Sequence, residues 1–344
     1  IPIGRVSAVN GTELKNYLNK VKEYEQVQST PSAFVADKAW MKSVIHVVGG
    51  ADSAENAQFK GYMDNYKRIL EDSLTGARVE TFEKTSASAV EQANGERIMQ
   101  LINEGVTEIG YFGHSSANTL AFNLSSPDIY NNRGRYSFFN VSGCSAGNFF
   151  TFDPQRLSGT MSISEKYVLA DQRGSIAFLA STSLGIPPFL NFYNNQLHSA
   201  MSRDLYGNTL GSQVKRVLED LGSNANSLDF YTRIHLEQIN LHADPAIKVN
   251  HFTLADYAIE DPLVKISPNM ITVADNSFSL KVKMVNLGRA VKDSIRISIK
   301  RKLPNDSIQV IYNQLIPAPF NADSLLLTVP INPLTEKGLN TIMI

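Results

Sequence analysis

Short apolar segments alternate with helical patterns along roughly the first 250 residues, and this alternation limits the fold more than any other feature of the sequence. The apolar segments are rich in β-branched and aromatic residues and are bounded by small or polar residues, as buried strands are. The predicted strands are 43–48, 78–82, 106–113, 136–143 and 174–180. Amphipathic helices are predicted before, between and after them, at 14–24, 59–74, 90–103, 162–169, 189–201, 210–221 and 231–238. We therefore expect an α/β fold with a doubly wound, mostly parallel sheet and flanking helices.

Four of the predicted strands end in residues that suit a ligand site, namely Gly49, His114, Cys144 and Ser181. The carboxyl ends of parallel strands meet at one edge of a sheet, where ligands bind. If the third and fourth strands are neighbours, His114 and Cys144 lie side by side. An imidazole can accept the proton of a thiol, and the thiolate can then attack a carbonyl carbon. Cys144 is the only cysteine in the chain, so no other thiol can take this role.

The residues around this pair are small, which favours a catalytic site over a buried structural cysteine. Gly113 and Gly143 precede the two residues, and Ser115 and Ser145 follow them. A substrate backbone must come within about 3 Å of the thiolate and of the groups that stabilise the developing oxyanion, so bulky side chains would obstruct it. A core cysteine would instead need large apolar neighbours, although a buried cysteine is the commoner fate of a lone thiol.

A rival motif lies in the same turn. The sequence 143–147, Gly-Cys-Ser-Ala-Gly, fits the nucleophile elbow G-x-S-x-G of α/β-hydrolases, with Ser145 as nucleophile and either His235 or His242 as base. The residues 149–154, with Pro154, would break the helix that must follow an elbow. The elbow hypothesis also gives His114 no role.

The polar segment 52–58 is predicted to be a loop at the same edge of the sheet, and it contains Asp52 and Glu55. These carboxylates could orient His114 or bind a basic substrate group. The alternative that we favour is that Asp52 caps a turn and Glu55 is a solvated loop charge. Ser181 and Thr182 are further candidates for substrate binding, because they follow a strand at this edge.

The remaining histidines predict no metal site. His46 lies within a strand and is expected in the core, and His198 lies on a helix face. His235, His242 and His251 lack the spacing of Cys, His or Asp that zinc ligands show.

In the first helix, an apolar face is predicted from Leu14, Tyr17, Leu18, Val21 and Tyr24.

Composition excludes several classes of function. The formal net charge is −1 and no basic run is interleaved with aromatic residues, so a nucleic-acid partner is not expected. No apolar run approaches the roughly 20 residues of a membrane span. A single cysteine allows no internal disulfide, so cysteine usage does not set the compartment.

The chain starts at Ile1 without a methionine or a signal peptide, and we expect residues before it to be missing.

The pattern changes beyond residue 249. Helical periodicity stops, and segments such as 279–286 and 295–300 alternate apolar and polar residues with a period of two. Turn residues separate these segments, which predicts a small β-sandwich. The expected domains are 1–252 and 262–344, with a boundary in 252–262.

The order of four motifs resembles the gingipain family of cysteine peptidases. These motifs are Gly110-Tyr-Phe-Gly-His114-Ser-Ser, Phe138-Phe-Asn-Val-Ser-Gly-Cys144-Ser-Ala-Gly-Asn148, Gly174-Ser-Ile-Ala-Phe-Leu-Ala-Ser181-Thr and Ala243-Asp244-Pro245-Ala-Ile-Lys-Val249. The resemblance covers about residues 1 to 250. It implies a caspase-like catalytic domain followed by an immunoglobulin-like β-sandwich. The smaller α/β subdomain that precedes this part in the family is expected to be missing.

The resemblance implies that Cys144 is the nucleophile, that His114 is the general base, and that the reaction passes through a thioester. The oxyanion hole of the family maps to the backbone N–H groups of Cys144 and Ser115. The family usually has glycine at the second position, and serine would be strained there if φ must be positive. Arginine-cleaving members use an aspartate beyond the first strand. The equivalent place here lies nearest Gln58 or Phe59, so arginine specificity does not follow.

Relatives of this kind include the sortase of the type IX secretion system, which removes a C-terminal sorting domain from secreted proteins. The implied location is secreted or on the outer-membrane surface of a Gram-negative bacterium. The implied partner is a protein or peptide substrate, and no cofactor is required, although structural Ca²⁺ would fit the family. The alternative function is an inactive scaffold or attachment protein that keeps the peptidase fold. The sequence leaves the oligomeric state open.

Overall fold

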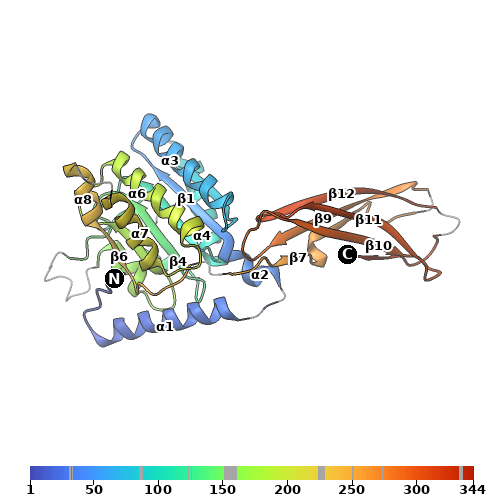
Figure 1. Cartoon of the computed structure of the whole chain (residues 1–344), viewed down its shortest axis with the longest axis horizontal. Coiled ribbons are helices and arrows are strands. Elements are labelled where there is room, and N and C mark those ends of the chain that lie inside the picture. The colour runs from blue at the N-terminus through green and yellow to red at the C-terminus, as the bar shows by residue number, and fades with distance from the viewer. Residues whose placement is uncertain are drawn as a thin grey trace. The chain divides into compact units, whose positions relative to one another are not determined.

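The computed structural model describes residues 1–30, 32, 34–84, 88–122, 124, 126–150, 161–223, 229–249, 252–272, 274–332 and 336–344 (Figure 1). The chain divides into two compact units. The first unit comprises Ile1–Ser32 and Ala36–His251, and the second comprises Ala33–Val35 and Phe252–Ile344.

The first unit is built on a six-stranded sheet in the order β2-β1-β3-β4-β5-β6. Its strands are β1 (Ser43–Gly49), β2 (Arg78–Glu83), β3 (Glu108–Gly113), β4 (Ser137–Ser142), β5 (Ser175–Ser181) and β6 (Ile239–His242). The first five strands are parallel, which confirms the predicted mostly parallel sheet. β6 pairs with β5 in the antiparallel sense and was not predicted. It has four residues and follows a helix directly, so it carries too little pattern to be recognised.

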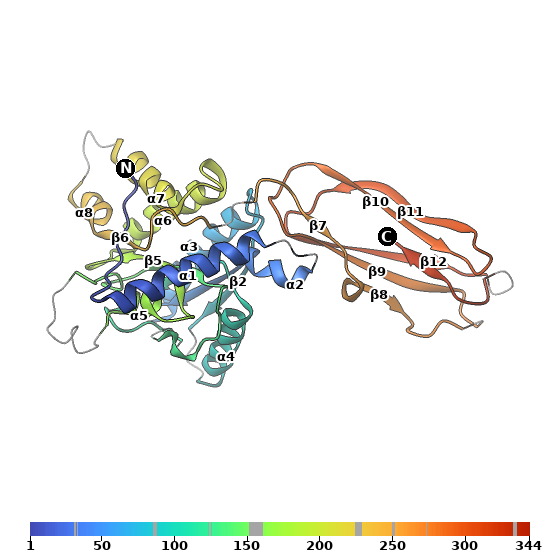
Figure 2. The same ribbon diagram turned by 90° about the horizontal axis from the view of Figure 1, so that it is seen from below.

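The helices of the first unit lie on the two faces of this sheet (Figures 1 and 2). The helices α1, α4 and α5 pack on one face, and α3 and α6 pack on the other, with α7 and α8 packed against α6. The bounds are α1 (Gly11–Ser29), α3 (Ser53–Glu71), α4 (Ser88–Glu104), α5 (Ile163–Leu169), α6 (Pro187–Ser199), α7 (Leu210–Ser223) and α8 (Phe230–Gln238). A short helix α2 (Val35–Lys38) and a 3₁₀ turn (Ala39–Lys42) precede β1, a 3₁₀ turn (Pro127–Ile129) precedes β4, and a π-helical turn (Ala200–Asp204) follows α6.

The two faces of the sheet differ in chemistry because side chains alternate along each strand. Ile45, Ile109 and Phe139 belong to the apolar core under α1, α4 and α5. The neighbouring positions on the other face include four buried polar residues, His46, Glu108, Asn140 and Ser142. The strands that lead to the predicted site therefore rest on a buried polar layer, and α6 packs against β4 over this layer.

The buried face of α1 agrees with the predicted one only in part, since Tyr17 and Tyr24 are buried as predicted. Leu14 and Leu18 are exposed by 45% and 47%, whereas Lys20 is almost fully buried. Its Nζ donates hydrogen bonds of 2.9 and 3.1 Å to the carbonyl oxygens of Tyr167 and Val168, near the C-terminus of α5. Burial lowers the pKa of Lys20 to about 7. An apolar pattern could not reveal this face, because a lysine forms its centre.

The second unit contains two sheets, β11-β10-β13 and β12-β9-β7, with β8 also paired to β9 (Figure 2). The strands are β7 (Tyr257–Ala258), β8 (Val264–Ser267), β9 (Ser277–Asn286), β10 (Ser294–Lys302), β11 (Ile308–Pro317), β12 (Ala322–Pro330) and β13 (Thr341–Met343), with a 3₁₀ turn at Asp261–Leu263 before β8. Leu280, Val282 and Met284 of β9 alternate inward and pack with Ile297 and Ile299 of β10. This arrangement agrees with the predicted period of two and is consistent with a β-sandwich.

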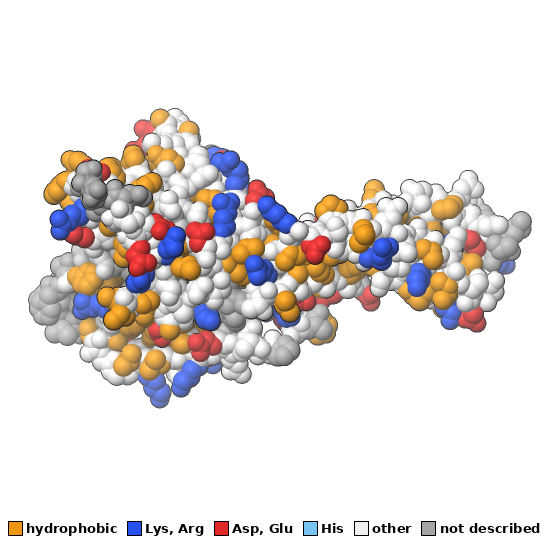
Figure 3. All heavy atoms as spheres, in the orientation of Figure 1, with side chains coloured by type: hydrophobic (Ala, Val, Ile, Leu, Met, Phe, Trp, Pro, Cys, Tyr) orange, Lys and Arg blue, Asp and Glu red, His pale blue; other side chains and the backbone are white. Residues whose placement is uncertain are grey.

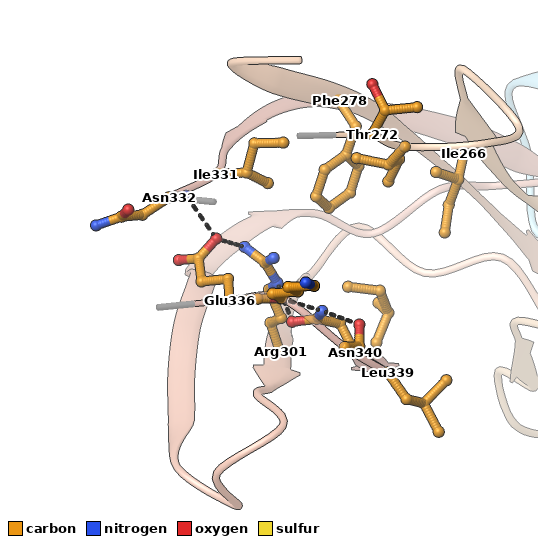
Figure 4. Close-up of a pocket in the computed structure, with 13 residues that line it drawn as sticks. Ile266, Thr272, Phe278, Arg301, Ile331, Asn332, Glu336, Leu339 and Asn340 are labelled. Atoms are coloured by element: carbon orange, nitrogen blue, oxygen red, sulfur yellow. Dashed lines mark hydrogen bonds and ion pairs between the residues drawn. The ribbon is translucent and has the colours of Figure 1, made fainter. Parts of the chain in front are cut away.

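The core of the second unit opens into a hollow of about 310 Å³ (Figure 4). Apolar side chains such as Phe278 and Ile331 line it together with a buried ion pair. In this pair, Arg301 Nη1 lies 2.9 Å from Glu336 Oε2, and Arg301 Nε donates to Asn340 Oδ1 at 3.0 Å. The guanidinium group thus joins β10 to the chain that leads into β13.

The helices and the surface charges of the described residues bear on a membrane span and on the charge balance. None of the helices in the described ranges is long and apolar enough to cross a membrane. On the face of the molecule in Figure 3, Lys and Arg side chains are interspersed with Asp and Glu side chains. This mixture agrees with the net charge of −1.

Candidate active site

His114 and Cys144 follow adjacent strands at the same edge of the sheet. The strands β3 and β4 are parallel neighbours, with Phe112 opposite Ser142 in the register. His114 and Cys144 each come two residues after this pair. On one side of β3 the strand β1 ends at Gly49, and on the other side of β4 the strand β5 ends at Ser181. The four predicted strand ends therefore line one edge in the order Gly49, His114, Cys144, Ser181.

Glycines allow the backbones of these turns to approach closely. A Cβ atom at Gly143 would lie 2.7 Å from the carbonyl oxygen of Gly113 and would overlap the hydroxyl of Ser115. At Gly113 a Cβ atom would collide with the backbone of Gly49, 2.6 Å from its carbonyl carbon. Any larger residue at either position would push the turns apart. The small residues noted in the sequence thus let the two turns pack closely together, and they also leave room for a substrate to approach.

The thiol of Cys144 is half-buried and faces the loop that follows β5. The N–H of Gly185 donates a hydrogen bond of 3.4 Å to Sγ, and Sγ is 3.8 Å from the carbonyl oxygen of the same residue. An N–H directed at the sulfur favours negative charge there. Sequence reasoning missed Gly185, because its position opposite the thiol depends on the path of the loop.

The loop 181–186 is fixed on both sides. Ser145 N–H donates to the carbonyl of Ser183 at 2.8 Å, which ties the loop to the cysteine turn. From α8, the Gln238 side chain donates to the carbonyl of Leu184 at 2.8 Å, and Nε2 of His235 accepts the N–H of Ile186 at 2.8 Å. These bonds place the Gly185 N–H against Cys144.

Ser181 and Thr182, predicted as substrate-binding residues, also hydrogen-bond within the loop. The Ser181 hydroxyl is fully buried and donates to the carbonyl of Ser183 at 2.9 Å. The Thr182 hydroxyl donates to the carbonyl of Gln238 at 3.1 Å. Their hydroxyl groups therefore hold the loop that borders Cys144.

His114 is paired with Glu55. Its Nε2 lies 2.8 Å from Oε2 of Glu55, and 62% of the His114 side chain is exposed. Glu55 also accepts the N–H of Ala51 at 2.8 Å. The Ala51 N–H and the His114 imidazole together lower the pKa of Glu55. Because Nε2 contacts Glu55, Nδ1 is the ring atom left for a thiol or a substrate.

Residues 53–58 are helical, so the predicted loop is wrong. The helix α3 begins at Ser53, and Asp52 is its N-cap, with Oδ1 accepting the N–H groups of Ala54 and Glu55 at 2.9 Å. The interpretation that we favoured for Asp52, that it caps the following residues, is confirmed. The interpretation of Glu55 as a solvated loop charge is wrong. This residue lies in the first turn of the helix, which directs its carboxylate at His114.

Ser115 does not show the backbone strain that a glycine replacement would suggest. The described non-glycine residues with positive φ are Phe122, Ser145, Gln172 and Asp306, and Ser115 is not among them. Its hydroxyl donates to the carbonyl of Cys144 at 2.7 Å, so it locks the two turns together. Among the described residues, no acceptor takes the backbone N–H of Ser115 or Cys144. These are the two N–H groups that the resemblance assigns to the oxyanion hole.

Ser145 adopts φ of 56°, a left-handed conformation that is uncommon for serine. The two histidines proposed as its base bond elsewhere. His235 accepts from Ile186 N–H and lies 2.7 Å from the carbonyl of Tyr231, and His242 Nε2 is 3.1 Å from the Ser7 hydroxyl. Within the described residues, neither contacts Ser145. The argument that no helix follows the elbow rests on residues 151–154, which lie outside the described residues. His251 lies outside them too.

The buried polar layer lies next to the cysteine turn. As predicted, His46 lies in the core, where burial lowers its pKa to about 3. His198 is also fully buried, and its Nε2 is 3.0 Å from Oε1 of Glu108. Sequence reasoning missed Glu108, although a charged residue inside an apolar strand was a visible signal. Asn140 donates to Asn194 at 2.8 Å and Asn194 donates to the Ser142 hydroxyl at 2.6 Å, two residues before Cys144.

The described residues contain no cluster of three or more His, Cys, Asp and Glu side chains that could hold a metal ion. The reactive groups of the site are a thiol, an imidazole, a carboxylate and backbone N–H groups that have no acceptor among the described residues. A thiol and an imidazole at one edge, with N–H donors beside them, can transfer an acyl group.

Comparisons with known proteins agree with this chemistry. A family model, peptidase family C25, matches residues 1–250. The fold is similar to that of the Arg-specific cysteine proteinase gingipain R (RgpB), with a TM-score of 0.56, 12% identity, and coverage of 99% of this chain and 71% of that chain. The complex of the pro- and mature domains of Porphyromonas gingivalis RgpB matches with a TM-score of 0.56, 12% identity, and coverage of 99% and 73%. A structure described only as a protease matches with a TM-score of 0.55, 13% identity, and coverage of 94% and 73%. No curated protein sequence matches the chain.

Proposed function

The chain belongs to peptidase family C25, the gingipain family, and is a cysteine-type peptidase that acts on protein or peptide substrates, and we propose that Cys144 is its nucleophile and His114 its general base. The observation that carries this assignment is the position of both residues, each two places after a paired register position of β3 and β4. Cys144 is also the only cysteine in the chain.

In the proposed first step, Nδ1 of His114 accepts the thiol proton and Sγ attacks the carbonyl carbon of the substrate. The carbonyl oxygen becomes an oxyanion, which the backbone N–H groups of Ser115 and Cys144 stabilise. The C–N bond then breaks, the amine leaves with the proton from His114, and a thioester to Cys144 remains. Attack by water, whose proton passes to His114, releases the acid and restores the thiol.

Glu55 is proposed as a positioning residue that acts through His114. Its contact with Nε2 leaves Nδ1 as the ring atom that can accept the thiol proton, and its carboxylate stabilises the imidazolium that forms during attack. The side chains of His114 and Glu55 are both more than one-third exposed, so water screens their interaction in the absence of substrate. A bound peptide that covers the pair would strengthen it.

The decisive experiment uses a labelled acyl-type probe that reacts with activated cysteines. We expect labelling of the wild-type protein, none in Cys144→Ala, and much slower labelling in His114→Ala. If the folded wild-type protein takes no label, the proposal that Cys144 is catalytic is wrong, and an inactive scaffold or attachment protein becomes the better hypothesis. Matched circular dichroism spectra of the three proteins establish that each is folded.

Ser145 is the one residue that supports a second catalytic hypothesis, because its left-handed backbone resembles the strained turn of a nucleophile elbow. The hydrogen bonds of His235 and His242 to other residues count against it. Ser145→Ala separates the two hypotheses. Retained peptidase activity supports Cys144, whereas lost activity together with active Cys144→Ala protein supports the serine hydrolase.

Specificity for arginine is not part of the proposal, although the similar enzyme RgpB is described as Arg-specific. Of the two positions that the resemblance places in that role, Phe59 is buried in the core and Gln58 donates to the Tyr62 hydroxyl. Neither offers a carboxylate to a basic side chain.

We further propose a sortase-type role, in which the enzyme removes C-terminal sorting domains of secreted proteins at the outer-membrane surface of a Gram-negative bacterium. The support is the motif resemblance together with the β-rich second unit. The chemistry needs no cofactor, and structural Ca²⁺ outside the site is compatible with it. Digestion of a mixed peptide library with and without an added amine nucleophile tests the role. Amide products at the expense of acids support transfer, and acids alone support a simple hydrolase.

A further inference from the structure

Two hollows on the first unit share part of their lining, and His114 borders one of them. Their volumes are about 410 and 520 Å³, and both are lined by Lys84, Leu120 and Ala121. His114 lines the first hollow, and Met99 and Ile129 line the second. We call these two hollows together the leaving-side groove.

The order of the strands fixes where this groove lies relative to the reacting atoms. Lys84 follows β2, which lies at the edge of the sheet beyond β1 and β3. Cys144 follows β4 on the other side of His114, and the loop with Gly185 lies beyond it, after β5. A peptide laid along this edge meets the Gly185 loop, Cys144, His114 and the groove, in that order.

In the proposed mechanism, the proton that His114 takes from the thiol goes to the departing amine. The amine side of the cleaved bond must therefore face His114, and the acyl side must face the loop beyond Cys144. We propose that the leaving-side groove binds the residues on the carboxyl side of the cleaved bond and selects an apolar side chain there. This inference rests on the proposed function and adds a specificity site to it.

The lining supports an apolar occupant. Met99 is exposed by 36% and Ile129 by 52%, while Leu120 between the two hollows is nearly buried. A methionine adapts its shape to different partners. The charged side chains of the groove are of both signs, with Lys84 in the shared part and Glu91 and Glu96 from α4 in the second hollow. Charge alone therefore gives no strong preference, and desolvation of the apolar residues remains the main attraction.

The test compares Met99→Glu with Leu218→Glu, a matched control. Leu218 is exposed by 38% on α7, another helix of the first unit, and it lines neither hollow. Each protein digests a peptide library that is randomised on both sides of the cleaved bond, and mass spectrometry identifies the products. We expect wild type and Leu218→Glu to enrich apolar residues within the first few positions after the cleavage point. Met99→Glu should reduce this enrichment about tenfold, a typical effect of one apolar contact, and keep the preference before the cleavage point.

A binding measurement separates this inference from the proposed function, because it needs no catalysis. The probe is the peptide Ala-Leu-Ala-Phe-Gly-Gly with a fluorophore at its carboxyl end, titrated into Cys144→Ala protein and followed by anisotropy. We expect saturable binding that the added Met99→Glu change weakens about tenfold and Leu218→Glu does not. Equal binding by both double variants, or a cleavage preference that survives Met99→Glu, overturns the groove assignment. Binding without any cleavage by wild type would instead contradict the catalytic proposal and leave the groove standing.

Discussion

The imidazole of His114 and the carboxylate of Glu55, 59 positions apart in the chain, meet at 2.8 Å across the ends of β3 and β1. The helix α3 brings Glu55 there, because Asp52 caps its first turn and so sets where the helix begins. A residue expected to be a solvated loop charge thus becomes the partner of the proposed base. Four predictions follow from this and from other contacts in the first unit.

Glu55→Gln should reduce kcat/KM for peptide cleavage at least about tenfold, because the ring of His114 loses its negatively charged partner. Glu55→Asp should recover part of the loss if the carboxylate is what matters. The effect should appear mainly in kcat, measured with a peptide substrate at several pH values. Asp64→Asn is the control: it removes an exposed ion pair with Lys60 on the same helix and should leave kcat/KM unchanged. Equal activity of Glu55→Gln and wild type would exclude the positioning role.

Gly185→Ala should slow the reaction of Cys144 with iodoacetamide and lower kcat about tenfold. A Cβ atom at Gly185 would lie 2.6 Å from Leu190 Cδ1 and 3.0 Å from the carbonyl oxygen of Gly143, so the Leu190 side chain must move, and the crowding against Gly143 should weaken the contact between the Gly185 N–H and the sulfur. The matched control is Gly61→Ala in α3, where a Cβ atom meets nothing within 4 Å. That change should raise stability by up to about 1 kcal/mol and leave the thiol reactivity as it is.

Glu108→Gln should lower the free energy of unfolding by about 3 kcal/mol, because it leaves His198 buried without its partner. Burial alone would raise the pKa of Glu108, but the charge and hydrogen bond of His198 outweigh burial and lower it. For His198, burial alone lowers the pKa, and Glu108 reverses this and raises it. Urea denaturation measures the difference. Glu237→Gln, which removes an exposed ion pair with Arg233, serves as control and should leave the midpoint unchanged.

The pH dependence of stability should reveal Lys20. Its pKa is about 7 in the folded protein, against an ordinary value of 10.5. Between these two values the unfolded chain binds the additional proton, so the contribution of Lys20 to stability rises with pH by up to about 1.4 kcal/mol per pH unit, and it is lost as the pH falls toward 7. Lys20→Met should remove this dependence. We would measure the difference in unfolding free energy between wild type and variant at pH 7, 8 and 9. A constant difference would show that Lys20 does not titrate in this way.

The alternation of strands and helices, the parallel sheet, and the positions of His114 and Cys144 at strand ends can all be predicted from the sequence. These features are local or periodic: apolar runs and helical spacing record which side of each element is buried. Parallel pairing then brings successive carboxyl ends to one edge, so the proximity of His114 and Cys144 follows from the fold class.

The partners that come from separate elements cannot be predicted in this way, because they depend on how the chain folds in three dimensions. The path of the loop after β5 placed the Gly185 N–H against Cys144, and the start of α3 placed Glu55 against His114. The burial of Lys20 on α1 and of Glu108 in β3 depends on hydrogen-bond partners supplied by α5 and α6. A sequence pattern records how often a residue type is buried, whereas a charged residue is buried only when a particular distant group compensates it. Such compensation exists only in the folded chain.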